Sequence, residues 1–307
     1  MLFPLFDLHC DTAFETEKSN QGLTENDLAI SLDGAKSISP YVQVMAIWTP
    51  PTLPDEAGWQ AFLRVYKHLK GDQAVTDGKV LFGNYSPSSE RPNLLLSVED
   101  GRIIGRELSR LDTLRALGAK ILTPFWAGVN SLGGAHDTDT GLSPFGKKAL
   151  QKALDLGMIL DLSHASVVSA REMLSLAEGC DRPVIASHSN AYDLCPASRN
   201  LHREEIKRIV AVGGLIGLNL HKPFLKEDGN ATIDDLLRQI DYFLEQGTED
   251  CLALGGDLDG CKPIPEIQKI GDYQKLWERL LDEGFPLSFV QNLFFGNADR
   301  FAKKHFS

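Results

Sequence analysis

A chain of 307 residues, 43% hydrophobic and 24% charged, has the size of one large α/β barrel or two ordinary domains and an ordinary globular composition. Its net charge of −11 argues against nucleic acid and anionic membrane surfaces as partners. No apolar run approaches the roughly 20 residues that span a bilayer, and the first residues lack the features of a signal peptide. The odd number of cysteines, without any CxxC spacing, favours free thiols. We therefore expect a cytoplasmic protein.

Short apolar segments alternate with helical patterns along the chain. The apolar segments are rich in Val, Ile and Leu and mostly lack polar alternation, as strands covered on both faces do. The predicted strands cover 2–8, 41–48, 93–98, 119–123, 158–162, 183–187, 214–220 and 251–256. The predicted helices cover 55–70, 102–117, 144–156, 166–178, 202–212, 232–246, 273–283, 286–295 and 297–305. For the helix at 144–156, Ser143 is the expected N-cap and Pro144 the first helical residue.

Eight strands separated by helix-bearing connections favour an α/β fold, a (β/α)₈ TIM-type barrel that occupies residues 1–307 as a single catalytic domain. A doubly wound open sheet is the alternative. Such a sheet usually has fewer strands and carries a glycine-rich phosphate loop after its first strand. Here His9 and Asp11 follow the first strand, and no GxGxxG motif does.

Several predicted strands end in side chains that bind metal ions. His9 and Asp11 lie two residues apart, so on an extended strand end they point to the same side. Four later strands are followed by Glu99, His164, His188 and Asp257. In a barrel these positions converge on one mouth, where active sites are found. Carboxylates clustered there would repel one another without a cation. A pair of divalent ions bridged by Glu99 would remove this repulsion and activate water.

Other polar residues near these strand ends have structural interpretations. Cys10 should point to the opposite face from His9 and pack in the core. Asp161 is a weaker candidate and is interpreted as structural, whereas Asp259 is either a supporting group or a loop acid. For His221 the rim of the site and the surface are equally favoured. Three histidines in polar helical stretches are expected to be solvated, namely His68, His202 and His305.

These residues lie in motifs that resemble the membrane dipeptidase (renal dipeptidase) family of zinc peptidases, peptidase family M19 of the amidohydrolase superfamily. The matching segments are Asp-Leu-His-Cys-Asp at 7–11, Ser-Val-Glu-Asp-Gly at 97–101, Gly-Leu-Ser-Pro-Phe-Gly at 141–146, Asp-Leu-Ser-His at 161–164, Ser-His-Ser-Asn-Ala at 187–191, Ala-Ser-Arg-Asn at 197–200 and Gly-Gly-Asp-Leu-Asp-Gly at 255–260. They span nearly the whole chain in family order. Together they are specific, although each alone is a weak match.

The resemblance implies a binuclear site for two Zn²⁺ ions. His9 and Asp11 would bind one ion, His164 and His188 would bind the other, and Glu99 would bridge them. It also implies a dipeptidase that cleaves dipeptides with a free C-terminal carboxylate, in which a metal-bridged hydroxide attacks the peptide carbonyl. Some members of the family accept a D-residue at the C-terminal position. Barrel enzymes of this kind often pair, so a homodimer is one candidate assembly, although the sequence leaves the oligomeric state open.

Two further roles follow from the same resemblance. Arg199 matches the family arginine that binds the substrate carboxylate, a task that suits the guanidinium fork better than a lysine. Asp257 matches the acid after the last strand that handles the proton of the attacking water.

One position departs from the family pattern. The family's Leu-Thr-x-x-His after the fourth strand is here Leu122-Thr123-Pro124-Phe125-Trp126, so Trp126 replaces the histidine that contacts the scissile carbonyl. His136, in the same glycine-rich loop, is either a stand-in or a solvated loop histidine. This departure keeps two alternatives open. One is an amidohydrolase that acts on another small amide or lactone, and the other is a catalytically weakened metal-binding homologue.

Overall fold

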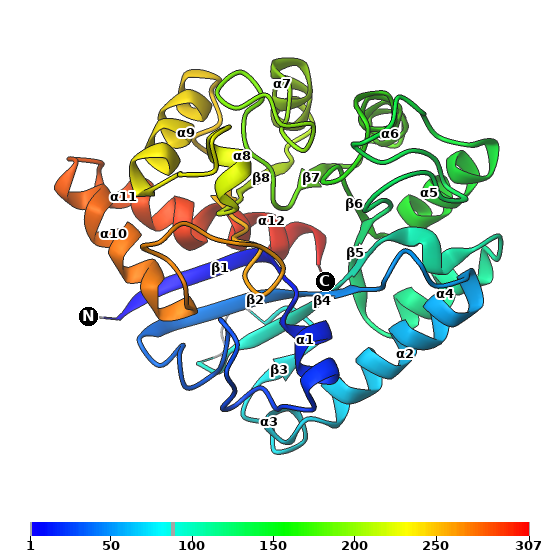
Figure 1. The fold of residues 1–307 in the computed structure, drawn as a ribbon, viewed down its shortest axis with the longest axis horizontal. Helices are drawn as coiled ribbons and strands as arrows, with labels where there is room; N and C mark the ends of the chain where they lie inside the picture. The colour runs from blue at the N-terminus through cyan, green and yellow to red at the C-terminus, as the bar shows by residue number, and fades with distance from the viewer. Residues whose placement is uncertain (1, 87–89, 307) are drawn as a thin grey trace.

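Eight parallel strands close into a barrel in this computed structural model, which describes residues 2–86 and 90–306. Around the ring the strands follow the order β2-β1-β9-β8-β7-β6-β5-β4, and β4 pairs back to β2. The helices lie outside this ring (Figure 1). The strands of the barrel are β1 (Phe3–Cys10), β2 (Ile38–Trp48), β4 (Asn93–Glu99), β5 (Ala119–Thr123), β6 (Ile159–Asp161), β7 (Val184–Ala186), β8 (Leu215–Leu218) and β9 (Leu252–Leu254). The predicted (β/α)₈ fold is confirmed.

A further short strand, β3 (Leu81–Phe82), was not predicted. It pairs with the first residues of β4, on the edge that β5 uses farther along that strand. The remaining elements are α1 (Thr12–Ser19), α2 (Asp55–Gly71), α3 (Gln73–Thr76), η1 (Gly101–Ile104), α4 (Ser109–Ala116), α5 (Pro144–Asp155), α6 (Val167–Gly179), α7 (Arg203–Ala211), α8 (Lys222–Leu225), α9 (Ile233–Glu245), η2 (Ile270–Asp272), α10 (Tyr273–Asp282), α11 (Leu287–Gln291), η3 (Asn292–Gly296) and α12 (Asn297–His305).

The structure departs from the predicted helices in two regions of the chain. The helix predicted at 102–117 begins only at Ser109, because the preceding 3₁₀ turn η1 ends at Ile104 and is followed by Gly105 with a positive φ of 57°. The helices predicted at 286–295 and 297–305 form one continuous segment, since a π-helical turn, η3, joins α11 to α12.

The last helix closes the amino-terminal end of the barrel. Phe301 and Phe306 pack against residues inside the ring, among them Phe6 and Ile121. Asn297 donates hydrogen bonds to the backbone carbonyls at the start of β9. The opposite, carboxyl-terminal mouth remains open for a site.

The expected free thiols are confirmed for all five cysteines. Among the helices that the structure describes, none combines the length and the apolar character needed to cross a membrane.

Candidate active site

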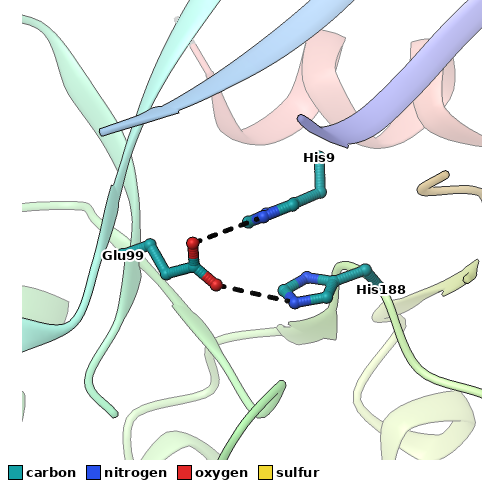
Figure 2. Close-up of side chains that lie close together, drawn as sticks. All are labelled: His9, Glu99 and His188. Atoms are coloured by element: carbon teal, nitrogen blue, oxygen red, sulfur yellow. Dashed lines mark ion pairs between the residues drawn. The ribbon is translucent and has the colours of Figure 1, made fainter. Parts of the chain in front are cut away.

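The carboxylate of Glu99, at the end of β4, lies between histidines from two other strands (Figure 2). Its Oε2 is 3.6 Å from His9 Nε2, and its Oε1 is 3.0 Å from His164 Nε2 and 3.7 Å from His188 Nε2. Each oxygen therefore faces a different set of histidines. This is the arrangement expected of a carboxylate that bridges two ions.

The two histidines that follow β6 and β7 face each other at very short range. His164 Nε2 and His188 Nε2 are 3.0 Å apart, and both side chains are almost wholly enclosed. Burial lowers the pKa values of both imidazoles, so both are neutral at neutral pH. Each neutral ring carries a single N–H proton. Which nitrogen holds it decides whether the Nε2–Nε2 contact is a hydrogen bond or an approach of two lone pairs.

Neighbouring groups determine the tautomer of each ring. His164 Nδ1 lies 2.9 Å from the Trp126 carbonyl oxygen, which can only accept, so Nδ1 carries the proton. Ser187 Oγ donates to Asp161 Oδ2 at 2.5 Å and therefore accepts from His188 Nδ1 at 2.7 Å. Both Nε2 atoms are left with lone pairs that point at each other. A cation between them removes the repulsion.

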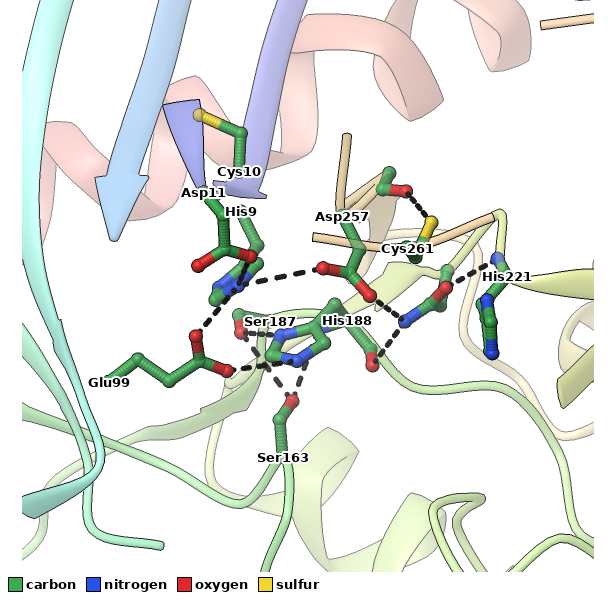
Figure 3. Close-up of polar contacts among 12 residues, drawn as sticks. His9, Cys10, Asp11, Glu99, Ser163, Ser187, His188, His221, Asp257 and Cys261 are labelled. Atoms are coloured by element: carbon green, nitrogen blue, oxygen red, sulfur yellow. Dashed lines mark hydrogen bonds and ion pairs between the residues drawn. The ribbon is translucent and has the colours of Figure 1, made fainter. Parts of the chain in front are cut away.

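A second group of possible ligands surrounds His9. Nε2 of His9 is buried and has no hydrogen-bond partner among the described residues, yet it lies 3.6 Å from Asp11 Oδ2 and 3.9 Å from Asp257 Oδ1. Figure 3 shows these side chains converging, while Cys10 points away from them toward β2, as expected. The ligand atoms of His9, Asp11 and Asp257 lie within 4.8 Å of one another, as do those of His9, Glu99 and His188.

The carboxylates of this cluster differ in their affinity for protons. Burial opposes ionisation of Glu99, but the adjacent histidines, above all His9, outweigh burial and hold its pKa well below the usual range. Burial and the nearby charge of Glu99 raise the pKa of Asp11, and burial raises that of Asp257 to about 6. Buried imidazole nitrogens and carboxylate oxygens in this proximity fit a pair of divalent ions.

Asp161, which we interpreted as structural, lies directly beneath the histidines. Besides Ser187 Oγ, its carboxylate accepts from Thr123 Oγ1 at 2.7 Å and from the backbone N–H groups of Ser163 and Ser187. The side chain makes no contact with the cavity itself. Its effect on the site passes through Ser187 to His188, as does that of many carboxylates behind metal-binding histidines.

Two aspartates after β9 have different surroundings. Asp257 Oδ2 accepts a hydrogen bond of 3.2 Å from Asn219 Nδ2, and Oδ1 faces His9. Asp259 accepts from Thr12 Oγ1 and from the backbone N–H of Ala29, each at 2.6 Å, so its carboxylate anchors α1 and the following loop. Asp259 is therefore a supporting group.

Gly260 allows two of the carboxylates to meet. A Cβ atom at this position would lie 2.0 Å from Asp11 Oδ2 and 2.6 Å from Asp257 Oδ1. The close approach of the two side chains therefore requires glycine here.

Arg199 lies in the loop after β7, and its guanidinium is buried beside the mouth of the barrel. Nη2 is 3.5 Å from the His188 carbonyl oxygen and Cζ lies 5.5 Å from the centre of the Phe224 ring, but Nε and Nη1 have no partner within the described residues. Burial lowers its pKa to about 10, so the group stays charged at neutral pH. A buried cation with unused donors is suited to a bidentate anion such as a carboxylate.

A cavity of about 630 Å³ opens above these residues. Asp11, Glu99, His164, Arg199 and Asp257 all contribute to its lining. Its volume is in the range of small-molecule sites, which makes it the candidate substrate cavity.

Trp126 and His136 also line this cavity. The Trp126 ring stacks at 28° on His164 with centroids 6.2 Å apart. His136 Nδ1 lies 2.8 Å from Ser198 Oγ, and burial together with the charge of Arg199 lowers its pKa to about 4. His136 is therefore a neutral, half-buried residue of the cavity and not a solvated loop histidine.

The remaining histidines fall into two groups. His221 lines the cavity, and its Nδ1 accepts a hydrogen bond from the Lys262 backbone N–H, so the rim position is confirmed. Three others are half-buried and not solvated as expected, namely His68, His202 and His305.

Sequence reasoning did not single out three aromatic residues of the cavity, Phe14 of α1, Trp48 at the end of β2 and Phe224 of α8. A signal for Trp48 was present, because it ends a predicted strand just as the candidate metal ligands do. Nothing comparable marked Phe14, since α1 itself was not predicted.

The barrel and the cluster at its mouth define a metal-dependent hydrolase. The model of the family "Membrane dipeptidase (Peptidase family M19)" matches residues 2–305, and the chain belongs to this family of metallo-dipeptidases. A Klebsiella pneumoniae protein described as an uncharacterized protein in the pqqA 5' region is 31% identical over 199 residues, which are 61% of this chain and 72% of that protein.

Solved structures share the fold. A Rhodobacter sphaeroides metallo peptidase liganded with a phosphinate mimic of the dipeptide L-Ala-D-Ala superposes with a TM-score of 0.92 at 21% identity, covering 99% of this chain and 100% of that one. The probable dipeptidase PvdM from Pseudomonas aeruginosa superposes with a TM-score of 0.87 at 19% identity, covering 99% of this chain and 95% of that one.

Proposed function

We propose that this protein is a cytoplasmic, zinc-dependent dipeptidase that hydrolyses dipeptides with a free C-terminal carboxylate, including those with a D-residue at that end. The observation that carries the proposal is the buried guanidinium of Arg199, whose Nε and Nη1 have no partner among the described residues, in the same cavity as the histidine and carboxylate cluster. A free carboxylate and a scissile carbonyl lie a few bonds apart in a dipeptide, which matches this juxtaposition. The free thiols agree with a reducing compartment.

Five residues would hold two zinc ions. His9 and Asp11 would hold one, His164 and His188 the other, with Glu99 shared between them. When bound, the ions would polarise the peptide carbonyl and lower the pKa of water so that hydroxide is available near neutral pH.

The other side chains of the cavity would orient the substrate and move the proton. Arg199 would hold the carboxylate and so place the peptide carbonyl over the cluster. Asp257, whose pKa burial raises to about 6, would take the proton of the attacking water and deliver it to the leaving amine. His136 is neutral and close to His164, and its ring could donate to the developing oxyanion in place of the family histidine.

The test is an assay of zinc-loaded protein on a panel of L-L and L-D dipeptides beside N-acylated amino acids and small lactones. Cleavage of free dipeptides above the other classes supports the proposal. Preference for an N-acyl amide or a lactone would favour the amidohydrolase alternative, for which Trp126 in place of the family histidine is the supporting observation. No turnover of any class by metal-loaded protein would favour a metal-binding homologue.

Replacing Arg199 by Met should mainly weaken the binding of free dipeptides. Loss of a charge-assisted bidentate contact is expected to cost on the order of 2–4 kcal/mol in kcat/KM. The measurement compares each dipeptide with its C-terminal amide. Amidation should harm the wild-type enzyme strongly and Arg199→Met very little, whereas equal sensitivity of both proteins would contradict the assignment.

Replacing Trp126 by His should raise the turnover of dipeptides and broaden their range. An oxyanion donor at this position is typically worth about 10²–10³ in kcat, and the backbone carbonyl that holds His164 is retained. The comparison includes His136→Ala, which should lower kcat if His136 supplies the donor. Unchanged rate and preference in Trp126→His would exclude Trp126 from substrate selection.

A further inference from the structure

The cavity has an apolar side formed by three aromatic residues, Phe14, Trp48 and Trp126, which we call the aromatic wall. The ring centroids of Phe14 and Trp48 are 4.9 Å apart at 89°, and those of Trp48 and Trp126 are 5.3 Å apart at 62°. All three side chains are only half-buried, and all face the cavity. They therefore offer a continuous aromatic surface to whatever enters.

Trp48, which contacts both other rings of the aromatic wall, lies on the opposite side of the mouth from Arg199. In the ring order of the barrel, β2, which ends in Trp48, is four strands away from β7, after which Arg199 follows. Glu99 and His164 also line the cavity, and they follow β4 and β6, which lie between β2 and β7 in the ring. A dipeptide that spans the mouth with its carboxylate on Arg199 must direct its amino-terminal residue toward the aromatic wall.

Charged residues near the wall neutralise each other. Lys18 Nζ lies 2.9 and 3.0 Å from the two carboxylate oxygens of Glu15, and it also covers the Phe14 ring at 5.6 Å. Both residues line the cavity. Because this pair is internally matched, it adds no net charge beside the wall that would select a charged side chain.

We propose that the aromatic wall is a specificity subsite for the amino-terminal residue of the substrate, and that it selects planar, aromatic side chains. This inference rests on the proposed dipeptidase function, and it names the substrate class of that site. Aromatic rings favour edge-to-face and offset contacts with other rings. The rings of the wall are inclined to each other at 62° and 89°, so a substrate ring that stacks on one of them presents its edge or face to the next. Covering exposed aromatic surface with a further ring removes apolar area from water on both partners.

The experiment measures kcat/KM of zinc-loaded full-length protein on Gly-Ala, Ala-Ala, Leu-Ala and Phe-Ala, and on the reversed dipeptide Ala-Phe. We expect Phe-Ala to exceed Gly-Ala by about tenfold or more, because one or more apolar groups placed in a fitting pocket are worth roughly 10–200-fold. Trp48→Ala should remove most of this ratio. Ala127→Phe, which adds bulk to the cavity lining directly after Trp126 in the chain, should shift the preference toward Gly-Ala even if Trp48→Ala fails to fold.

Trp59→Ala is the matched control, because Trp59 stacks on Phe62 of the outer helix α2 and its loss should leave the Phe-Ala to Gly-Ala ratio unchanged. A flat series in the wild type, or a preference that follows the second residue, would overturn the inference.

A binding measurement separates this inference from the proposed function. Tryptophan fluorescence of zinc-loaded protein is titrated with Phe-Ala and with Gly-Ala. If Phe-Ala binds more tightly but no dipeptide is cleaved, the subsite stands and the dipeptidase proposal fails. If dipeptides are cleaved without any preference for Phe-Ala, only the subsite fails, and if neither dipeptide binds nor is cleaved, both fail.

Discussion

Glu99→Gln is expected to lose one of two zinc ions and to lower kcat/KM by roughly 10³-fold or more, because metal polarisation supplies several kcal/mol of the transition-state stabilisation. The amide keeps the size of the side chain but cannot offer a negative oxygen to an ion beside each histidine group. In the wild-type protein His9 and His164 lie 3.6 and 3.0 Å from the carboxylate. Metal content after saturation with zinc and dialysis provides a measurement that does not depend on turnover.

Glu205→Gln is the matched control for this experiment. Glu205 is equally buried, but it pairs with Arg171 on the outer helices, at 3.0 Å. The control should keep both ions. A wild-type protein that holds only one ion after saturation, or a Glu99→Gln protein that holds two, would contradict the bridged site.

Asp257→Asn should retain zinc and lose roughly 10²-fold or more in kcat. The amide preserves the shape of the side chain, and Asn219 can still pair with its oxygen, so the site should remain assembled. What disappears is the carboxylate that we propose as the group that accepts and returns a proton. The measurements are metal content, single-turnover rate and kcat on the best dipeptide of the panel.

Asp259→Asn separates proton transfer from support of the loop. Its carboxylate is already occupied by Thr12 and by the backbone of Ala29, so we expect mainly a lower melting temperature and a kcat near that of the wild type. A kcat loss confined to Asp259→Asn, with near-normal turnover in Asp257→Asn, would move the proton-transfer role to Asp259.

The barrel could be predicted from the sequence because buried parallel strands are recognisable as apolar runs. The run at 119–123 coincides with β5 to the residue, whereas the run at 214–220 is longer than β8, Leu215–Leu218, because Asn219 and Leu220 already belong to the loop at the rim. The start of α4 was wrong because a periodic pattern does not reveal that Gly105 interrupts it.

The candidate site was predictable where its residues end strands. His9, Glu99 and His188 meet because the carboxyl ends of the barrel strands share one mouth. The hydrogen-bond chain from Asp161 through Ser187 was not predictable, since it depends on which face of β6 points into the ring. The place of Phe14 in the cavity could not be predicted either, because α1 has a weak helical pattern and owes its position to tertiary contacts.

The ring closes between its first and last strands, and this has a consequence for biogenesis. β1 pairs with β9, and the cap at the other end of the barrel is α12, the last helix. His9 and Asp257, which face each other across this seam, are therefore made near the start and near the end of translation. A growing chain on the ribosome can form the intervening strand–helix units, but it cannot assemble the complete ligand cluster until almost all of its residues have been synthesised. Nascent, unfinished copies should consequently be unable to bind metal in the proposed binuclear arrangement, and they should depend on chaperones to shield the open edges of β1 and β8.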